Sequence, residues 1–170
     1  MRPARLIAAG LGLGFAPRAP GTVASAAAAG LGVLLISLDK ALLPLATLAA
    51  IVLGMWAVGA VAREARGELG DPRWIVIDEV AGQWVALLGL ARLTPLGVAA
   101  AFLVFRLLDI TKLGPVGWVD RQRGPAAVMG DDLVAGFITA IVMAALSLYA
   151  PQLLDARILA AGILDLRFPG

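Results

Sequence analysis

The sequence has no cysteine and no histidine among its 170 residues. The absence of cysteine excludes a disulfide framework, a thiolate nucleophile and the usual ligand set of a zinc site. The absence of histidine excludes a Ser-His-Asp triad, a phosphohistidine and an imidazole proton shuttle. Hydrolytic chemistry in this chain must therefore use carboxylates, hydroxyls and hard metal ions. Magnesium fits that inventory, because it takes oxygen ligands and is usually held by a few carboxylates together with a substrate phosphate.

Charged residues are also scarce, at 15% of the chain, whereas hydrophobic residues make up 61%. A soluble domain typically has about 25% charged and about 45–50% apolar residues. The net charge of +2 is small, and the basic residues form no run, which argues against a nucleic-acid partner. We therefore predict an integral membrane protein with a single domain over residues 1–170, since the chain is too short for two independent cores.

Five apolar segments come close to the length of about 20 residues that a helix needs to cross the hydrocarbon core. They are Val23–Leu38, Ala41–Ala62, Trp74–Ala91, Pro95–Leu108 and Val134–Ala150. The expected fold class is all-α, an integral membrane helical bundle of about five membrane-embedded helices with short loops. The tail, residues 152–170, has a mixed pattern and could form a helix at the membrane interface.

The basic residues are divided unevenly between the two sides of this predicted bundle. Five spans place the N-terminus and the loops at 63–73 and 109–131 on one side. Ten basic residues lie there: Arg2, Arg5, Arg18, Arg63, Arg66, Arg73, Arg106, Lys112, Arg121 and Arg123. The other side has four: Lys40, Arg92, Arg157 and Arg167. Because cytoplasmic loops carry the excess of lysine and arginine, we predict that the first side is cytoplasmic.

Two adjacent carboxylates, Asp78 and Glu79, lie within the third apolar segment. No lysine or arginine lies between Trp74 and Ala91 to offset their charge. An ionised carboxylate at the centre of a bilayer costs about 2.5–3.5 kcal/mol on insertion scales. We infer that these acids have a metal, a proton or a cationic partner. Adjacent helical residues diverge by about 100°, so one acid could bind a metal while the other activates water or holds an arginine.

Four further acids lie near the ends of other apolar segments: Asp109, Asp120, Asp131 and Asp132. In the predicted topology, all six acids lie at the cytoplasmic face. The topology was drawn from the basic residues alone, so this convergence is a separate feature of the chain. We expect Asp78, Glu79, Asp109 and one of Asp131 and Asp132 to lie within shared metal-coordination distance, because unpaired acids are hard to sustain at this depth.

Basic residues flank one of these acids on the predicted fourth helix. Arg106 and Asp109 are three residues apart and share a helical face, as do Asp109 and Lys112 if the helix continues. A carboxylate between two cations suits a phosphate that is bound jointly by a metal and a guanidinium group. A simple salt bridge at a helix end is the alternative.

The remaining acids also have structural alternatives. An aspartate at a helix start caps free amide groups and favours the helix dipole, which could explain one residue of the Asp131-Asp132 pair. The second then points to a ligand role. Asp120 and Arg121 could bind substrate or could form a solvated pair in a loop.

The segment before the first predicted span contains a possible anion site. Thr22 resembles a helix N-cap, and a helix start offers free amides and a positive dipole end to an anion. Arg18 is close enough in sequence to assist. Capping of the helix without ligand binding is the alternative.

Three sequence blocks resemble the phosphatidylglycerophosphatase A family. They are residues 14–26 (GFAPRAPGTVASA), 71–84 (DPRWIVIDEVAGQW) and 105–136 (FRLLDITKLGPVGWVDRQRGPAAVMGDDLVAG), about 60 residues in all. The resemblance implies a magnesium-dependent phosphatase that converts phosphatidylglycerol phosphate to phosphatidylglycerol. The acids of the family match the six named above, and its basic positions match Arg106, Lys112 and Arg121. The chain departs from the family at Gly114 and Gly117, where a tryptophan and an arginine are usual.

These observations combine into one hypothesis for the site. The candidate metal ligands are Asp78, Glu79, Asp109, Asp131 and Asp132. The candidate substrate-binding residues are Arg18, Thr22, Arg106, Lys112, Asp120 and Arg121. Glu79 would orient or deprotonate the attacking water, because it is adjacent to a metal ligand yet points elsewhere. The expected partners are an anionic phospholipid and the membrane, with the site on the cytoplasmic side of a bacterial inner membrane.

Two other function classes use similar residues. A cation or proton transporter also contains intramembrane carboxylates, but these are expected near the middle of broken helices. A lipid phosphotransferase with a carboxylate–metal site shares the membrane face and the substrate class. Its usual D-x-x-D-G…A-R…G…D-x-x-x-D pattern has no counterpart in this chain.

Overall fold

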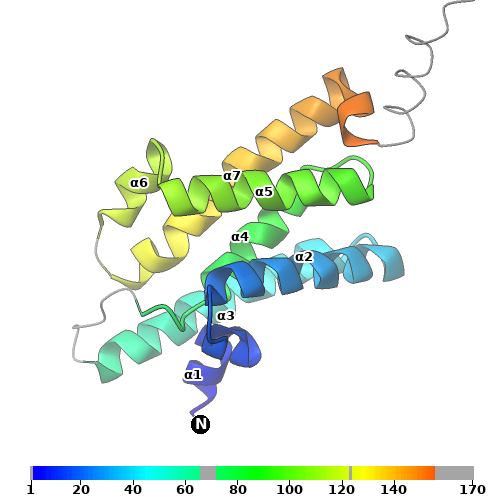
Figure 1. Ribbon diagram of the computed structural model, residues 1–170. Helices are drawn as coiled ribbons and strands as arrows, with labels where there is room; N and C mark the ends of the chain where they lie inside the picture. The colour runs from blue at the N-terminus through cyan, green and yellow to red at the C-terminus, as the bar shows by residue number, and fades with distance from the viewer. Residues whose placement is uncertain (1, 66–71, 123, 156–170) are drawn as a thin grey trace, which may run out of the picture.

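The computed structural model describes residues 2–65, 72–122 and 124–155, and this part of the chain is helical without any strand (Figure 1). The α-helices are α1 (Pro3–Ala8), α2 (Pro20–Leu38), α3 (Leu42–Glu64), α4 (Ile77–Leu88), α5 (Pro95–Thr111), α6 (Pro115–Asp120) and α7 (Pro125–Tyr149). The 3₁₀ helices are η1 (Gly10–Phe15) and η2 (Pro151–Leu154). The all-α fold class is confirmed. Most of the predicted interfacial tail lies outside the described residues.

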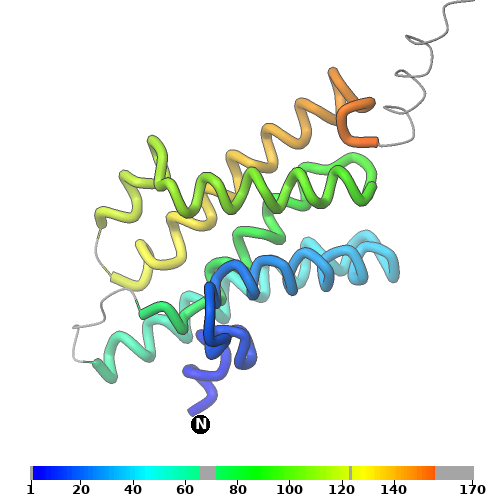
Figure 2. Tube along the Cα trace, viewed as in Figure 1, coloured from blue at the N-terminus to red at the C-terminus, as the bar shows by residue number. Residues whose placement is uncertain are grey.

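Three of the described helices are long and apolar enough to cross a membrane: α2 with 19 residues, α3 with 23 and α7 with 25. The prediction of about five spans is not confirmed. At a rise of 1.5 Å per residue, the 12 residues of α4 cover about 18 Å, well short of the roughly 30 Å hydrocarbon core. The 17 residues of α5 cover about 25 Å. The chain trace shows α4 and α5 as a hairpin whose second helix returns toward the starting end (Figure 2).

Helix α4 is shorter than the predicted span because the chain before it is not helical. The Val76 N–H donates to the carbonyl of Ala8, at the end of α1, with a length of 2.9 Å. The Ile75 N–H donates to the carbonyl of Pro72. Asp78 and Glu79 therefore lie in the first turn of α4, rather than one turn inside a longer helix. The positive end of the helix dipole favours two acids at this position.

Helix α4 is the central element of the bundle and packs most closely against α7. A Cβ atom added to Gly82 would lie 2.6 Å from the Asp132 carbonyl oxygen. A Cβ atom on Gly136 would overlap the Gly82 carbonyl, and one on Gly89 would overlap the Ala140 carbonyl. Glycines at these positions let the two backbones touch, as small residues do between membrane helices. This crossing brings the first turn of α4 beside the Asp131-Asp132 pair.

Prolines set where several helices begin, and three local predictions are corrected as a result. Helix α7 starts at Pro125, so Asp131 and Asp132 lie well inside it and do not cap it. Helix α2 starts at Pro20, with Ala19 as its N-cap, so Thr22 is a first-turn residue and not the cap. Proline suits the first turn because its missing N–H would be unpaired there anyway. Asp120 is the last residue of α6, rather than part of an open loop.

Candidate active site

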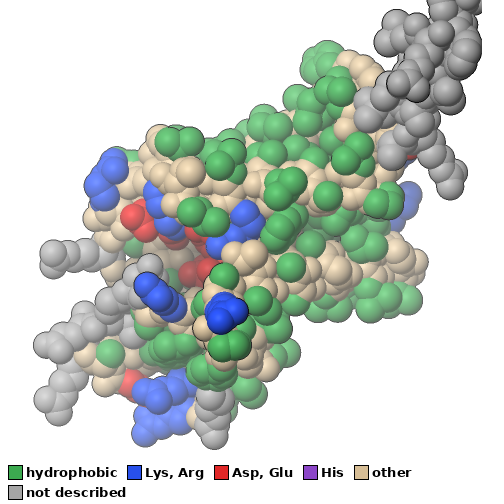
Figure 3. All heavy atoms as spheres, in the orientation of Figure 1, with side chains coloured by type: hydrophobic (Ala, Val, Ile, Leu, Met, Phe, Trp, Pro, Cys, Tyr) green, Lys and Arg blue, Asp and Glu red, His purple; other side chains and the backbone are tan. Residues whose placement is uncertain are grey.

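A cavity of about 1120 Å³ opens at one end of the bundle, where α2, α4 and α7 begin and where α3 and α5 end. All six acids singled out in the sequence line it: Asp78, Glu79, Asp109, Asp120, Asp131 and Asp132. We call it the acidic cavity. Figure 3 shows acidic side chains gathered in a hollow, with basic side chains at its edges. The site is thus assembled from helix ends that are far apart in the sequence.

The carboxylates form two groups that share one member. Asp78, Glu79 and Asp132 each place an oxygen within 4.8 Å of the others, and so do Asp109, Asp131 and Asp132. Asp132 is only 3% exposed, and the other aspartates of these groups are also buried. Burying several carboxylates together is costly unless cations compensate their charge.

Two basic side chains of the α5 end supply part of that compensation. The Arg106 guanidinium group pairs with Asp109. The Lys112 ammonium group pairs with Asp131 and lies 3.0 Å from an Asp109 oxygen, 3.7 Å from Asp132 and 3.8 Å from Asp120. Partial burial lowers the pKa of Lys112, but the hydrogen bond to Asp131 and the charges of Asp132 and Asp109 outweigh it and raise this pKa overall. Lys112 is therefore a permanent cation at neutral pH.

The compensation is incomplete on the α4 side of the cavity. Within the described ranges, neither Asp78 nor Glu79 forms a salt bridge with a basic side chain. Glu79 Oε2 and Asp131 Oδ1 are buried and have no hydrogen-bond partner in the same part of the chain. Each carboxylate group thus contains one buried oxygen without a partner, and all of its candidate ligand atoms are oxygens. A hard divalent cation could bind such an arrangement.

The first turn of α2 closes the cavity over Glu79. A Cβ atom on Gly21 would overlap the Glu79 Oε1 atom and would lie 3.5 Å from the Arg106 Nη1 atom. Glycine at this position therefore lets the backbone of α2 lie close to this carboxylate without displacing it. Thr22, in the same turn, also lines the cavity. Its position is consistent with a contact to an anion, although it does not cap the helix.

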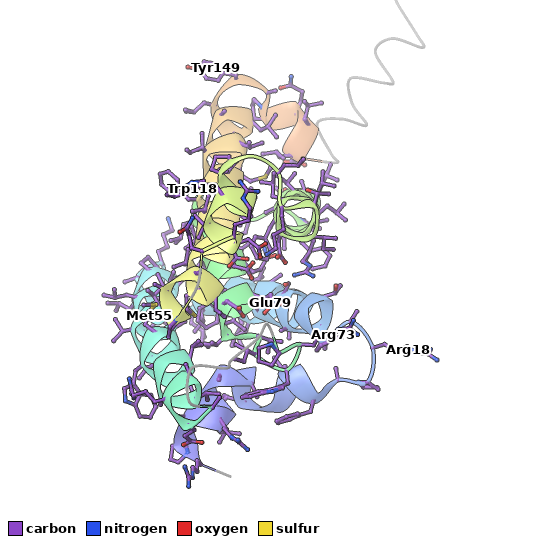
Figure 4. The ribbon with its side chains drawn as sticks, turned by 90° about the vertical axis from the view of Figure 1, so that its left-hand side faces the viewer. Arg18, Met55, Arg73, Glu79, Trp118 and Tyr149 are labelled. Carbon is purple, nitrogen blue, oxygen red and sulfur yellow. The ribbon has the colours of Figure 1, made fainter. Side chains whose placement is uncertain are left out.

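Two predicted substrate-binding residues lie outside the cavity lining. Arg18 is exposed, and Figure 4 shows it at the edge of the molecule, pointing away from Glu79. Arg121 is exposed just after α6 and does not line the cavity either. Asp120 does line it, but with a side chain that is 44% exposed. A substrate role for Arg18 and Arg121 stays a prediction.

Sequence reasoning missed two polar residues of the lining, Arg73 and Gln122. Arg73 precedes the acid pair by only a few residues in the non-helical segment before α4, and Figure 4 shows it on the same side of the molecule as Glu79. In the sequence, the charge of Arg73 indicated only the orientation of the chain in the membrane. Its closeness in sequence to Asp78 was the feature that could have identified it.

The sequence matches the family described as phosphatidylglycerophosphatase A over residues 6–147. The chain belongs to this family. It is 36% identical to phosphatidylglycerophosphatase A of Escherichia coli strain K12 over 142 residues, which are 83% of this chain and 81% of that protein. It is 31% identical to phosphatidylglycerophosphatase A of Haemophilus influenzae over 150 residues, 86% of this chain and 90% of that protein.

A third relative has a different name. A provisionally named phosphatidylinositol-3-phosphatase of Bacteroides thetaiotaomicron is 36% identical over 146 residues, 82% of this chain and 90% of that protein. No solved structure matches the chain. The family match confirms the resemblance found in the sequence blocks, and it makes the chain a phosphoric monoester hydrolase. The matched range contains every residue that lines the acidic cavity.

Proposed function

We propose that the protein hydrolyses phosphatidylglycerol phosphate to phosphatidylglycerol and inorganic phosphate in the acidic cavity. The observation that carries this proposal is the cluster of buried carboxylates and two basic side chains at the end of helices long enough to cross a membrane. A lipid phosphate lies at the level of the headgroups, which is where such a cavity would meet it. Membership in the phosphatidylglycerophosphatase A family supports the substrate.

We propose that Mg²⁺ binds here, because the site offers two three-carboxylate groups and buried oxygens without partners. Asp78, Asp109, Asp131 and Asp132 would hold it, with Glu79 as a further candidate ligand. A bound Mg²⁺ supplies charge neutralisation on the phosphoryl oxygens and lowers the pKa of an attacking water.

The protein side chains have separate roles in the proposed reaction. Arg106 and Lys112 donate hydrogen bonds to the phosphate oxygens and so fix the substrate. Glu79, with one unpaired oxygen, orients the water and accepts its proton, because a chain without histidine has only carboxylates for this role at neutral pH. The water oxygen bonds to phosphorus, the ester P–O bond breaks, and the departing lipid oxygen takes up a proton. Thr22 and Arg73 border the same space and would contact the headgroup.

We propose that this end of the bundle faces the cytoplasm of a bacterial inner membrane. Helices α4 and α5 form a hairpin that returns to the side from which it starts. The orientation of the other helices is therefore the same whether this hairpin crosses the membrane or not. The ten-to-four asymmetry of basic residues therefore still supports a cytoplasmic cavity. The native chain has no cysteine, so single cysteines introduced at Gly114 and Asp39 would report the two sides. Labelling of Gly114→Cys by a membrane-impermeant reagent from the periplasm would contradict the orientation.

The position of the acids argues against the transporter alternative. An ion path across a bilayer needs polar groups near the middle of the membrane, whereas these acids gather in one cavity at one end of the bundle. The Bacteroides relative brings phosphatidylinositol 3-phosphate into consideration as a second substrate. Both lipids are phosphoric monoesters that the same arrangement of cations could bind.

The deciding experiment measures phosphate release by the purified protein in lipid nanodiscs. The substrates are phosphatidylglycerol phosphate, phosphatidylinositol 3-phosphate and phosphatidic acid, each with Mg²⁺ and with EDTA. We expect the fastest release from phosphatidylglycerol phosphate, its loss in EDTA and its recovery on adding Mg²⁺. Faster release from another lipid would overturn the substrate assignment, and full activity in EDTA would overturn the metal assignment.

A further inference from the structure

Gln83 is a buried polar residue on α4 that the proposed reaction does not use. It is 0% exposed, and both its Oε1 and Nε2 atoms lack a hydrogen-bond partner in the described part of the chain. Buried side-chain amides are nearly always paired, because an unpaired one loses its hydration without replacement. A methionine or leucine of similar size would avoid that loss. The position of Gln83 therefore needs an explanation beyond packing.

The side chain of Gln83 extends from the same side of α4 as Glu79. The two residues are separated by one helical turn, which places their Cβ atoms about 5–6 Å apart. Glu79 Oε2 is itself buried and without a partner. A carboxylate oxygen and an amide N–H are complementary, and one helical turn is a distance that these two side chains can close directly or through one water molecule.

The neighbours of Gln83 on α4 show which helices it faces. Trp84 donates its indole N–H to the Ala28 carbonyl of α2, at 2.8 Å. Gly82 lies against Phe105 of α5. Because successive helical residues are rotated by about 100°, Gln83 should extend between these two directions, toward the region where α2 and α5 contact each other. In that region the Arg106 guanidinium group donates to the Ser25 hydroxyl at 3.4 Å.

The unpaired atoms in this region complement one another. Five buried side-chain atoms lack partners among the described residues, and four of them belong to Glu79, Gln83 and Arg106. Gln83 Nε2 and Arg106 Nε are donors, whereas Gln83 Oε1 and Glu79 Oε2 are acceptors. One amide could satisfy both of its neighbours, as a donor to the carboxylate and as an acceptor from the guanidinium group.

We propose that Gln83 is a positioning residue that ties Glu79 to Arg106 in the working enzyme. Its Nε2 donates to Glu79 Oε2 and its Oε1 accepts from Arg106 Nε, each directly or through one water. The amide thereby holds the group that orients water and the group that binds phosphate at a fixed separation. This inference rests on the proposed roles of Glu79 and Arg106, but not on the identity of the lipid.

The first test is Gln83→Met, which keeps the length of the side chain and removes both polar atoms. We expect kcat to fall roughly 10–100-fold, the usual effect of losing a supporting hydrogen bond behind a catalytic group. KM should change little, and the unfolding temperature of the variant, measured alongside, shows whether the protein is still folded under the assay conditions. The control is Leu87→Met, because Leu87 is 1% exposed on the same side of α4 one turn further on. It should leave kcat and KM unchanged.

A double-variant cycle separates positioning from packing. If Gln83 acts through Glu79, Gln83→Met should cause little further loss of kcat in a Glu79→Gln background. Multiplicative losses would overturn the proposal, and so would wild-type kcat in Gln83→Met. If Gln83→Met does not fold, Gln83→Asn retains the amide with one methylene less reach, and wild-type kcat in that variant would overturn the proposal as well.

All variants are assayed with the lipid phosphate that the wild-type protein hydrolyses fastest. A substrate other than phosphatidylglycerol phosphate would overturn the proposed function and leave the Gln83 test intact. Conversely, unchanged kcat in the Gln83 variants on phosphatidylglycerol phosphate would overturn only the positioning role.

Discussion

Helices α2, α3 and α4 each line two cavities with opposite chemistry. The acidic cavity lies where these helices begin or end, and its lining includes Gly21, Ala62 and Glu79. A second cavity of about 340 Å³, which we call the apolar cavity, lies between the same helices and the η1 segment. Its lining consists of apolar residues, among them Ala46 and Trp84. The same three helices thus serve two environments.

The difference follows from the helical repeat and from the depth of each cavity. On α4, Ile77, Val80 and Trp84 recur at intervals of three and four residues and face the apolar cavity. Asp78 and Glu79 lie between Ile77 and Val80 in sequence but face the acidic cavity. A rotation of about 100° per residue is enough to separate them. Charge is therefore confined to one face of the first turn of α4, and changes in the two cavities should have different consequences.

The largest effect is expected at Asp132, the acid that both carboxylate groups share. Asp132→Asn should lower phosphate release by at least the roughly 10²–10⁴-fold typical of losing a general base, and it should also weaken the affinity for Mg²⁺. The variant should remain folded, because a neutral amide is easier to bury than a carboxylate. A magnesium titration of activity checks this expectation, and an unchanged titration midpoint would remove Asp132 from the proposed ligand set.

The next effect is expected at Glu79, which contacts the first turn of α2. Glu79→Gln keeps the size of the side chain and removes its basicity, so turnover should fall by roughly 10²–10⁴-fold. Binding of Mg²⁺ and of substrate should be retained. Single-turnover phosphate release together with a metal-binding isotherm separates the two outcomes. Loss of Mg²⁺ affinity instead would make Glu79 a metal ligand and leave the base unassigned.

A smaller effect is expected at Lys112, which lies among four carboxylates. A hydrogen bond to a charged group contributes about 1.5–3 kcal/mol, so Lys112→Met should raise KM by roughly 10–100-fold. Lys112→Arg keeps the charge and should recover part of that loss. The raised pKa of Lys112 means that it stays protonated through neutral and mildly alkaline pH. A wild-type KM for Lys112→Met would exclude a direct contact with the phosphate.

The smallest effects come from one matched pair of substitutions on α3. Ala62→Leu places extra volume in the acidic cavity and should raise KM several-fold by obstructing the substrate. Ala46→Leu places the same volume in the apolar cavity and should leave activity unchanged. Filling an apolar space of this kind commonly raises stability by about 0.5–2 kcal/mol. Thermal unfolding and phosphate release, measured on both variants, test whether the two cavities are functionally separate.

The sequence predicted the composition of the site better than its geometry. The acids could be assigned to one end of the bundle because each lies near the end of an apolar segment. The start of α4 could not be predicted, because Trp74, Ile75 and Val76 are as apolar as the helix that follows. In the fold, the Val76 N–H donates to Ala8, far away in the sequence, and this contact helps to hold the segment out of the helix. No local sequence pattern predicts a contact between residues so far apart in the chain.

The place of the Asp131-Asp132 pair within α7 was mispredicted for a related reason. The residues from Pro125 onward are small or apolar and include Gly130, so they resembled a loop rather than a helix. Tertiary packing overrides that weak local preference. Arg73 was missed because it lies just before the predicted span Trp74–Ala91, although its closeness to Asp78 in the sequence was a usable signal.

The shortness of α4 has a consequence for how the protein is made. A 12-residue helix with two acids in its first turn is too short and too polar to enter a bilayer as an independent span. Its close neighbour is α7, whose Gly136 and Ala140 meet it backbone to backbone. Because α7 follows it in the chain, the ribosome synthesises α4 before its partner exists. Helix α4, which carries Glu79, is therefore part of an incomplete bundle until α7 is inserted. The site forms only after that step.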